Sequence, residues 1–293
     1  MQSRRAVIGY LFFAPALAVF LLVGLYPILY EVYLSFTDWY LLRNPQPVWH
    51  GLDGYQRLLT DGVLWASLLR TIFWTVGTVI IEYAIGLPFA LLLNRPSRVN
   101  AVLSGLILLP WVAPSIVVAY TWRWLLDGEY GALHHALRLL GLAGDRSLLV
   151  DPVLALLAVT LFSAWKGIPF MTVALLATLK SIPSEFYEAA AVDGASAWNR
   201  FRFITFPLLI PVSVVMTLVL GILAFYSFDL VWIMTKGGPG DATLLVGVYL
   251  FRQFFERNEL SYAATIGVAM LLLLLVFSAI YLNLFRRPAD GTA

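Results

Sequence analysis

Long apolar stretches alternate with polar segments along most of the chain. An α-helix rises about 1.5 Å per residue, so about 20 apolar residues in a row can cross a bilayer core roughly 30 Å thick. Six stretches meet this length, near Val7–Phe36, Thr71–Leu93, Ala101–Trp122, Val153–Leu179, Leu208–Met234 and Tyr262–Phe285. The pattern predicts an all-α membrane protein with six transmembrane helices, in a single membrane domain over residues 1–293.

The composition agrees with this prediction. Hydrophobic residues make up 61% of the chain and charged residues 12%, whereas average proteins have about 45 to 50% and about 25%. The mean hydropathy is +0.84. The net charge of +2 is spread thinly, without a basic run, so nothing indicates a nucleic-acid partner.

The sequence gives little support for catalytic or cofactor chemistry. The chain has no cysteine, and no lysine follows a glycine, so it contains no Walker A motif for ATP hydrolysis. The histidines lack the spacing of a metal site; they are His50, His134 and His135. We therefore expect no catalytic residue, no metal site and no cofactor.

The distribution of Lys and Arg predicts the orientation in the membrane. The segments on the side of the N-terminus are short and carry basic residues near the span ends, whereas the opposite loops are longer and richer in acids. The positive-inside rule then places both termini and the 180–206 loop in the cytoplasm. The first apolar run is longer than that of a signal peptide, which predicts an uncleaved anchor. The basic residues counted are Arg4, Arg5, Arg95, Arg98, Lys180, Arg200, Arg202, Arg286 and Arg287.

Proline and glycine interrupt several of the predicted spans. Each internal proline leaves a carbonyl without its helical donor, which is tolerated where protein or a water-filled cavity surrounds the backbone. Such breaks are typical of helices that line a translocation path, and equally of kinks that improve helix packing. The residues concerned are Pro88, Pro110, Pro114, Gly167 and Pro169.

A polar segment from Glu185 to Pro211 separates the fourth and fifth apolar runs. Ser184 is predicted to cap a first short helix, Gly194 to end it in a left-handed turn, and Ala195–Phe203 to form a second. Composition alone leaves two interpretations open, a polar surface that docks on another protein and an amphipathic helix lying on lipid headgroups. The polar residues are Glu185, Glu188, Asp193, Arg200 and Arg202, and the aromatic ones Trp198, Phe201 and Phe203.

The spacing within this segment resembles a known motif. Glu188-Ala189-Ala190 is followed by Gly194, then by Ile204 and Pro207. This resembles the EAA motif of the membrane subunits of binding-protein-dependent ATP-binding-cassette importers. The motif usually has leucine before the proline, and this chain has Phe206. The resemblance implies a type I ABC importer permease fold, with a transmembrane core over 66–285 and a cytoplasmic coupling loop over 184–206.

Further stretches resemble the carbohydrate branch of that family, the permeases for maltose, glycerol phosphate and related solutes. They are Tyr26-Pro27, Ser35-Phe36-Thr37-Asp38-Trp39, Gly51-Leu52-Asp53-Gly54-Tyr55, Leu179-Lys180-Ser181-Ile182-Pro183, Ser227-Phe228-Asp229 and Thr235-Lys236-Gly237-Gly238-Pro239. Arg70-Thr71 departs from the family's usual Asn-Thr, and no large extracytoplasmic insert is present.

The resemblance also implies the assembly. It predicts a multi-pass protein of a prokaryotic inner membrane, paired with a second permease and served by two cytoplasmic ATPase subunits and an extracytoplasmic solute-binding protein. In that family the coupling loop docks in a cleft of the ATPase subunit. The matching residues here are Glu185, Glu188, Ala189, Ala190, Asp193, Gly194, Ile204 and Pro207.

Charged residues inside the predicted spans are candidates for the translocation path. Glu82 and Lys166 fall near mid-membrane, where a lone charge costs about 2.5 to 3.5 kcal/mol. An ion pair between them would offset much of this cost, and we expect such a pair. Lys166, beside Trp165, is also suited to donate hydrogen bonds to a polyhydroxylated solute. Structural and solute-binding roles both stay open at this point.

Asp229 is predicted to lie about one turn inside the outer end of the fifth span, with Tyr226 and Trp232 nearby. A carboxylate among aromatic rings suits a sugar, although aromatics at helical spacing are more often packing or interfacial residues.

Two other functions share some of these sequence features. An ion-coupled secondary transporter also uses broken helices and midplane charges, but spans one to three show no visible repeat of the later half. A membrane-embedded enzyme would need a His or Cys cluster or paired acids, and only Glu82 and Lys166 lie at depth.

Overall fold

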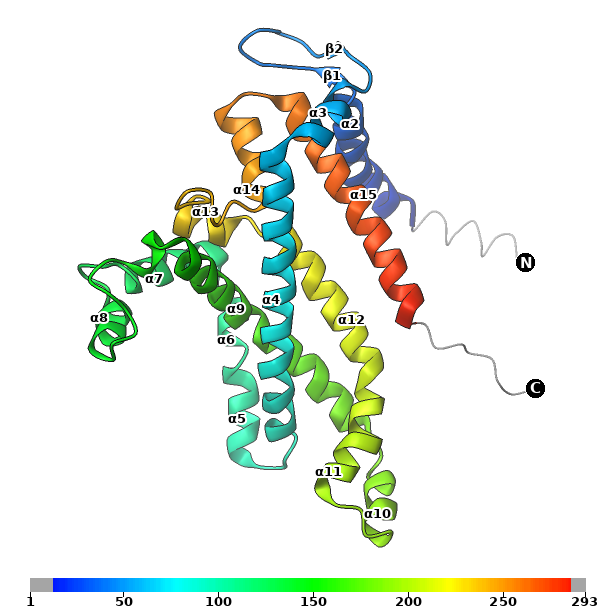
Figure 1. Ribbon diagram of the computed structural model, residues 1–293. Helices are drawn as coiled ribbons and strands as arrows, with labels where there is room; N and C mark the ends of the chain where they lie inside the picture. The colour runs from blue at the N-terminus through cyan, green and yellow to red at the C-terminus, as the bar shows by residue number, and fades with distance from the viewer. Residues whose placement is uncertain (1–12, 286–293) are drawn as a thin grey trace, which may run out of the picture. The chain divides into compact units, whose positions relative to one another are not determined.

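The computed structural model describes residues 13–285, which are mostly helical (Figure 1). The α-helices are α2 (Tyr26–Leu34), α3 (Asp53–Thr60), α4 (Gly62–Leu93), α5 (Arg98–Leu106), α6 (Leu109–Val112), α7 (Ser115–Leu125), α8 (Ala132–Leu139), α9 (Pro152–Ser181), α10 (Ser184–Val192), α11 (Ala197–Arg200), α12 (Phe206–Phe225), α13 (Asp229–Thr235), α14 (Val246–Phe251) and α15 (Leu260–Phe285). The π turns are η1 (Phe20–Leu25), η3 (Phe201–Thr205) and η4 (Arg252–Glu256), and η2 (Leu148–Val150) is a 3-10 turn. Strands β1 (Thr37–Asp38) and β2 (Val48–Trp49) pair antiparallel.

Among the described residues, five helices are long and apolar enough to cross a membrane, and a bent pair supplies a sixth when it is counted as one span. The bent pair is Arg98–Val112 with Ser115–Leu125, at 89°. The five are Phe13–Leu34, Gly62–Leu93, Pro152–Ser181, Ala197–Phe225 and Leu260–Phe285. The predicted all-α class is confirmed. Residues 7–12 of the first predicted span lie outside the described residues, as do Arg4, Arg5, Arg286 and Arg287.

The prediction for the fifth span was wrong at both ends. The helix begins at Ala197, because the π turn η3 joins α11 to α12 without a break, and it ends at Phe225 instead of Met234. The separate second short helix expected over Ala195–Phe203 is therefore the first part of this long helix. Beyond Phe225 the backbone leaves helical geometry at Phe228 (φ −125°), and α13 begins at Asp229. Hydropathy could not reveal this break, since both sides of it are apolar.

The prolines act differently from one another. Pro88 and Pro169 lie inside α4 and α9, which continue as α-helix through them. The break in the third span falls at Ala113 and Pro114, where both residues have extended ψ angles of 134° and 133°. Only this break turns the chain sharply, because Pro114 disfavours the helical conformation of the residue before it.

The chain divides into two compact units. The first comprises Met1–Leu64 and Tyr249–Val276, and the second comprises Trp65–Val248 and Phe277–Ala293. In the first unit, the C-cap of α2 and the start of β1 are joined to α15 by polar contacts: the Thr37 and Ser261 hydroxyls lie 2.7 Å apart, and Thr265 donates to the Ser35 carbonyl at 3.2 Å. The Glu31 carboxyl lies against Gly267, and any side chain at position 267 would occupy the space that this carboxyl fills.

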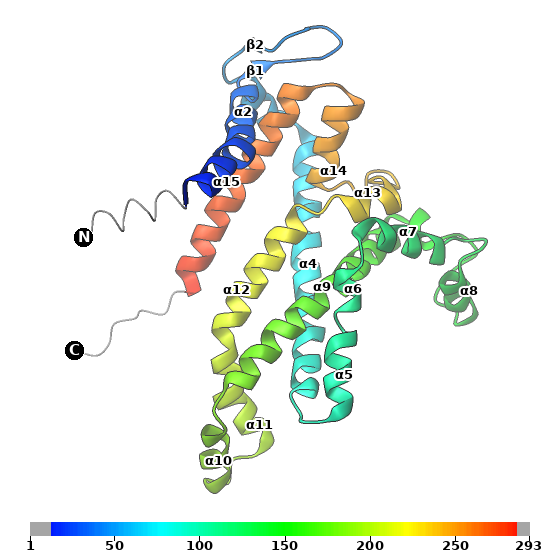
Figure 2. The ribbon, with the colours of Figure 1, turned by 180° about the vertical axis from the view of Figure 1, so that it is seen from behind.

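The second unit is organised by α9 and α12, which pack against each other and against α4. Their shared core consists of Ala90, Leu93, Met171, Leu175, Leu176, Leu179, Leu209, Met216 and Leu220. Gly86 permits the close approach of α4, since a Cβ there would lie 2.8 Å from Met171 Cγ. Both ribbon views place α10 and α11 at one end of α9 and α12, and α7 and α13 at the other end (Figures 1 and 2).

Candidate functional site

The polar segment between α9 and α12 forms a sharp helical turn. Gly194 has φ +74°, so the predicted left-handed conformation is confirmed. The Ala195 N–H donates to the Ala190 carbonyl at 2.8 Å and the Gly194 N–H to the Ala191 carbonyl at 3.1 Å. This is the Schellman pattern of hydrogen bonds that ends a helix, here α10. We name Ser184–Ser196 the tip.

The two helices of the tip begin differently. Ser184 was predicted to cap α10, and this is wrong: Pro183 is the N-cap and makes no side-chain cap bond, while Ser184 is the first helical residue. Ser196 is a true cap, because its hydroxyl accepts from the Asn199 N–H at 3.2 Å. Proline can stand at the start of α10 because no helical donor is required there.

The tip presents its polar residues outward. Glu185, Glu188, Ala189, Asp193 and Gly194 are exposed, whereas Ala190 is half-buried. Val192 is 89% exposed. An exposed apolar side chain surrounded by exposed acids suits a contact with another protein. Protein interfaces typically have a polar rim around an apolar centre from which water is removed.

The tip is fastened to the helix that follows it. The hydroxyls of Tyr187 on α10 and Thr205 on η3 lie 3.0 Å apart, and Thr205 is buried. Ile204 and Pro207 flank this contact on the same helix and are half-buried. The later residues of the motif therefore lie beside this contact and not on the outer surface of the tip.

A cavity of about 420 Å³ lies in the second unit. It is lined by Thr78, Glu82, Trp111, Ser115, Ser163, Lys166, Gly167, Leu220, Leu223, Ala224, Tyr226, Ser227, Phe228, Asp229 and Leu230. Four of the five predicted path residues, Glu82, Lys166, Tyr226 and Asp229, are thus brought together. The fifth, Trp165, does not line it; its ring meets Trp122 edge-on at 5.4 Å.

The expected ion pair between Lys166 and Glu82 is absent from the described residues, so this prediction was wrong. The Lys166 ammonium instead donates to Ser115 Oγ, at the first turn of α7. Asp229 also interacts electrostatically with Lys166. Ser115 follows the Pro114 break, which directs α7 toward α9, and hydropathy carries no information about that geometry.

Glu82 is buried and only 4% exposed, and its Oε2 has no hydrogen-bond partner in the structure. Its carboxyl lies against Gly167 of α9, where any Cβ would collide with it. Gly167, predicted as a break, is therefore a place where α4 and α9 approach closely.

Sequence reasoning missed several lining residues. Trp111 stacks on Phe170 at 5.4 Å with an interplanar angle of 5°, and Phe228 contributes a second aromatic wall. Thr78, Ser115 and Ser163 add hydroxyls. Small polar residues within apolar helices are common, so no signal in one sequence distinguished these.

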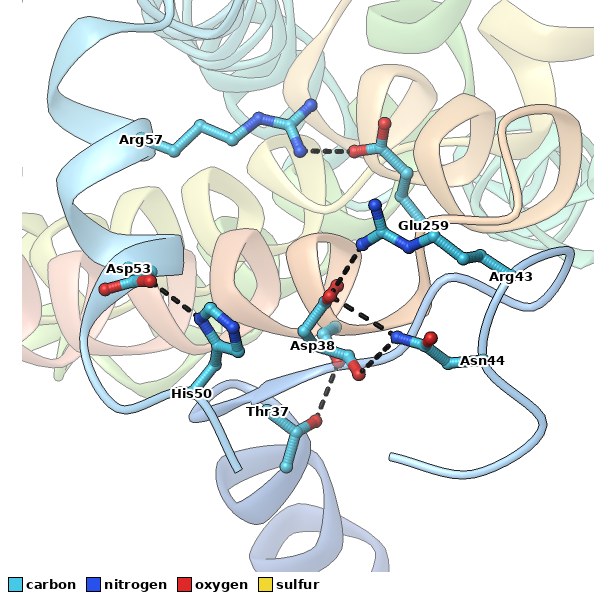
Figure 3. Close-up of polar contacts among 9 residues, drawn as sticks. Thr37, Asp38, Arg43, Asn44, His50, Asp53, Arg57 and Glu259 are labelled. Carbon is cyan, nitrogen blue, oxygen red and sulfur yellow. Dashed lines mark hydrogen bonds and ion pairs between the residues drawn. The ribbon is translucent and has the colours of Figure 1, made fainter. Parts of the chain in front are cut away.

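A second polar cluster lies in the first unit (Figure 3). Arg43 pairs with Asp38 at 2.7 Å, His50 with Asp53 at 2.7 Å, and Arg57 with Glu259 at 2.5 Å. The Arg43–Asp38 and His50–Asp53 pairs lie at the surface, where such pairs contribute about 0 to 1 kcal/mol each.

Asp61, next to this cluster, is held by more hydrogen bonds than these ion-paired residues are. The Tyr249 and Tyr262 hydroxyls both donate to Asp61 Oδ2 at 2.6 Å, and the Val63 and Leu64 N–H groups donate to Oδ1. Burial opposes ionisation, but these hydrogen bonds outweigh it and hold the pKa of Asp61 below its usual value. Asp61 thus caps α4 and ties it to α14 and α15.

Residues 82–290 match the family described as "Binding-protein-dependent transport system inner membrane component". The chain belongs to this family. It is therefore a membrane-spanning transport component, a permease subunit of an ABC importer.

One relative and two solved structures are similar to this chain over nearly its whole length. The permease is 34% identical to the trehalose/maltose transport system permease protein MalF of Thermococcus litoralis, over 99% of this chain and 97% of the relative. A bacterial ABC transporter that imports the acidic polysaccharide alginate has the same fold, with TM-score 0.82, 20% identity and 98% coverage of both chains. The bacterial alginate transporter in complex with a pentasaccharide-bound periplasmic protein matches with TM-score 0.81, 19% identity, and coverage of 99% and 98%.

One prediction follows from the cap of α4. Asp61→Ala leaves the hydroxyls of two buried tyrosines and two helix N–H groups without their acceptor. We expect the permease to lose about 1 to 3 kcal/mol of stability, measured as a lower thermal unfolding midpoint of the detergent-purified assembly. Because the pKa of Asp61 is lowered, its stabilisation is present above the usual Asp value of about 3.9 and is lost as the pH falls through the lower folded value.

Asp53→Ala is the matched control, since Asp53 is exposed and pairs only with exposed His50. Its effect should stay within about 0.5 kcal/mol. Equal midpoints for wild type and Asp61→Ala at neutral pH would contradict the role given to Asp61.

Proposed function

We propose that this permease translocates a sugar or related polyol that an extracytoplasmic binding protein delivers. ATPase subunits that bind the tip drive the transport. The observation that carries the proposal is the layout of α9 and α12. The cavity is lined by the middle of α9 and by the C-terminal end of α12, and the tip joins the C-terminal end of α9 to the helix that continues into α12. From Lys166 to Ser181 the helix spans roughly 22 Å at about 1.5 Å per residue.

The cavity suits a polyhydroxylated solute. Sugars bind where aromatic faces cover their C–H surfaces and polar groups meet their hydroxyls. Trp111, Tyr226 and Phe228 supply the faces, and Ser115, Ser163 and the charged residues supply hydrogen-bonding groups. The name of the trehalose/maltose relative supports the same class of solute.

The remaining partners follow from the same proposal. A second permease completes the translocation path, since one chain of this size provides one wall of it. Two ATPase subunits hydrolyse ATP, because this chain contains no Walker A motif. Both termini and the tip face the cytoplasm of a prokaryote, in accord with the positive-inside rule. The tip residues Glu185, Glu188, Ala189, Ala190, Asp193 and Gly194, anchored through Ile204 and Pro207, form the coupling element.

To couple ATP hydrolysis to transport, the tip must keep its conformation when the ATPase subunits move it. The Schellman turn at Gly194 and the Tyr187–Thr205 contact fix α10 relative to the helix that continues into α12. A displacement of the tip is then passed to α9 and α12 as a rigid-body movement. Alternating access of the cavity would follow from that movement.

Gly194→Val tests the tip directly. A β-branched residue at φ +74° costs about 1 kcal/mol or more, so the turn should rearrange. We expect normal membrane insertion, with loss of uptake and of binding-protein-stimulated ATP hydrolysis by the assembled importer.

Gly141→Val is the matched control for backbone strain. Gly141 has φ +73° and ends α8 with the same two hydrogen bonds, Gly141 N–H to Arg138 and Leu142 N–H to Leu137, away from the tip. It should retain coupled uptake. Uncoupling by both variants to the same degree would mean that strain alone is the cause, and coupled uptake by Gly194→Val would refute the role of the tip.

A charge reversal tests the docking surface. Glu188→Lys should weaken association of the ATPase subunits by roughly tenfold. The reason is that a lysine at this position would repel the basic surface that we expect the ATPase subunit to present to Glu188. The measurement is the ATPase retained when the complex is purified through this permease over a range of salt concentrations. Glu129→Lys, an exposed acid between α7 and α8, should leave association unchanged. Unaltered association in Glu188→Lys would favour a lipid-surface helix instead.

A further inference from the structure

Two buried polar side chains of α4 line the cavity, and each has a polar atom without a hydrogen-bond partner. Thr78 is 1% exposed and Glu82 is 4% exposed. The atoms concerned are Thr78 Oγ1 and Glu82 Oε2. The two residues stand four positions apart, so they lie on the same face of α4. Both belong to the second unit, as does the cavity that they line.

The Thr78 hydroxyl differs from the hydroxyls of other buried threonines in this unit. Thr71, Thr160 and Thr172 each donate to the backbone carbonyl four residues earlier in the same helix, at 2.8, 2.6 and 2.8 Å. A threonine inside a helix ordinarily has this option, and Thr78 does not use it. Because an unbonded buried hydroxyl costs stability, a purely structural role does not account for threonine at position 78.

Glu82 has neither a cation nor a hydrogen-bond donor that would stabilise a negative charge on its Oε2. The ion pairs among the described residues do not include it. Lys166, the nearest candidate, is engaged by Ser115 and Asp229. A carboxyl buried in this way is favoured as the neutral acid. The neutral acid carries one O–H donor and keeps acceptor capacity.

We infer that Thr78 and the uncharged Glu82 together bind a hydroxyl group of the solute at the α4 wall of the cavity. A sugar hydroxyl both donates and accepts, and these two side chains offer both functions about one helical turn apart. Both unpartnered atoms are covered in this structure, so a change of side-chain rotamer presents them to the solute. The inference rests on the proposed function and adds the groups of α4 that recognise the solute.

Such a site has opposite effects on stability and on transport. Replacing an unsatisfied buried polar group by an apolar group of similar shape is neutral or stabilising, whereas removing one partner of a formed hydrogen bond is destabilising. A polar residue kept for the structure therefore lowers stability when it is made apolar. A polar residue kept for the solute leaves stability unchanged or raises it, and transport falls, which is the usual trade-off at a functional site.

The test uses Thr78→Val and Glu82→Met in the assembled importer. Without solute, the thermal unfolding midpoint of this chain, read by immunoblotting of the heated soluble fraction, should be unchanged or higher by up to about 4 °C in each variant. Uptake of maltose and of trehalose into proteoliposomes, with the binding protein present, should fall roughly threefold to tenfold. Glu82→Gln keeps a donor and an acceptor at the same place, so its uptake should stay within about twofold of wild type.

Thr75→Val is the matched control. Thr75 Oγ1 is also buried without a hydrogen-bond partner, one turn before Thr78 on α4, but Thr75 does not line the cavity. Its midpoint should change in the same direction as that of Thr78→Val, and its uptake should equal that of wild type. A loss of uptake in Thr75→Val as large as that in Thr78→Val would trace both losses to α4 itself and would contradict a solute contact.

Lower midpoints in Thr78→Val and Glu82→Met would overturn the inference, because the polar atoms would then be bonded in the folded importer. Wild-type uptake of both sugars by these variants would also overturn it and would leave the proposed function intact. Loss of uptake in Glu82→Gln equal to that in Glu82→Met would contradict the uncharged form of Glu82.

A wild-type importer that takes up neither sugar would count against the proposed function instead. The midpoints need no solute, so they test separately whether Thr78 and Glu82 are unsatisfied in the folded importer. Unchanged or higher midpoints would support the inference, and lower ones would refute it.

Discussion

The packing of α9 against α12 is the contact on which the second unit depends. Within a bilayer, apolar residues gain little from leaving lipid, so helices associate through close van der Waals contact and buried polar bonds. Met171, Leu175 and Leu209 are fully buried at this contact. The tip is the connection between these two helices, and the cavity lies beside the middle of α9 and the C-terminal end of α12. A polar turn and a polar cavity are thereby joined by a stiff apolar body.

Two breaks in the helices of the second unit lie beside the cavity. The Pro114 break precedes Ser115, and the break after Phe225 precedes Asp229. Irregular backbone at membrane depth needs protein or water around it. The two breaks free short helices, α7 and α13, which pack on each other. This arrangement brings Ser115 and Asp229 to the same cavity as Lys166 of the unbroken α9.

The sequence made the spans and the tip predictable for different reasons. Apolar runs located the helices because a bilayer demands length and hydrophobicity, and Gly194 was recognisable because few residues tolerate a left-handed turn. The start of the fifth span at Ala197 was missed, since polar residues hid a helix continuous with the apolar part. The break before Asp229 was missed because apolar residues lie on both sides of it. The predicted pairing of Lys166 with Glu82 was wrong, because the depth of a residue in a span does not show which faces of two helices contact each other.

The unpaired state of Glu82 changes how its presence should be understood. A buried charge costs about 2.5 to 3.5 kcal/mol at mid-membrane even on lenient scales, and a salt bridge would have been the structural means of offsetting it. Lys166 is committed to Ser115 and Asp229 instead, and Gly167 leaves room for the acid beside α9. The close approach of α4 and α9 at Gly167 is therefore what holds the Glu82 carboxyl at the wall of the cavity, since any side chain at position 167 would occupy the same space.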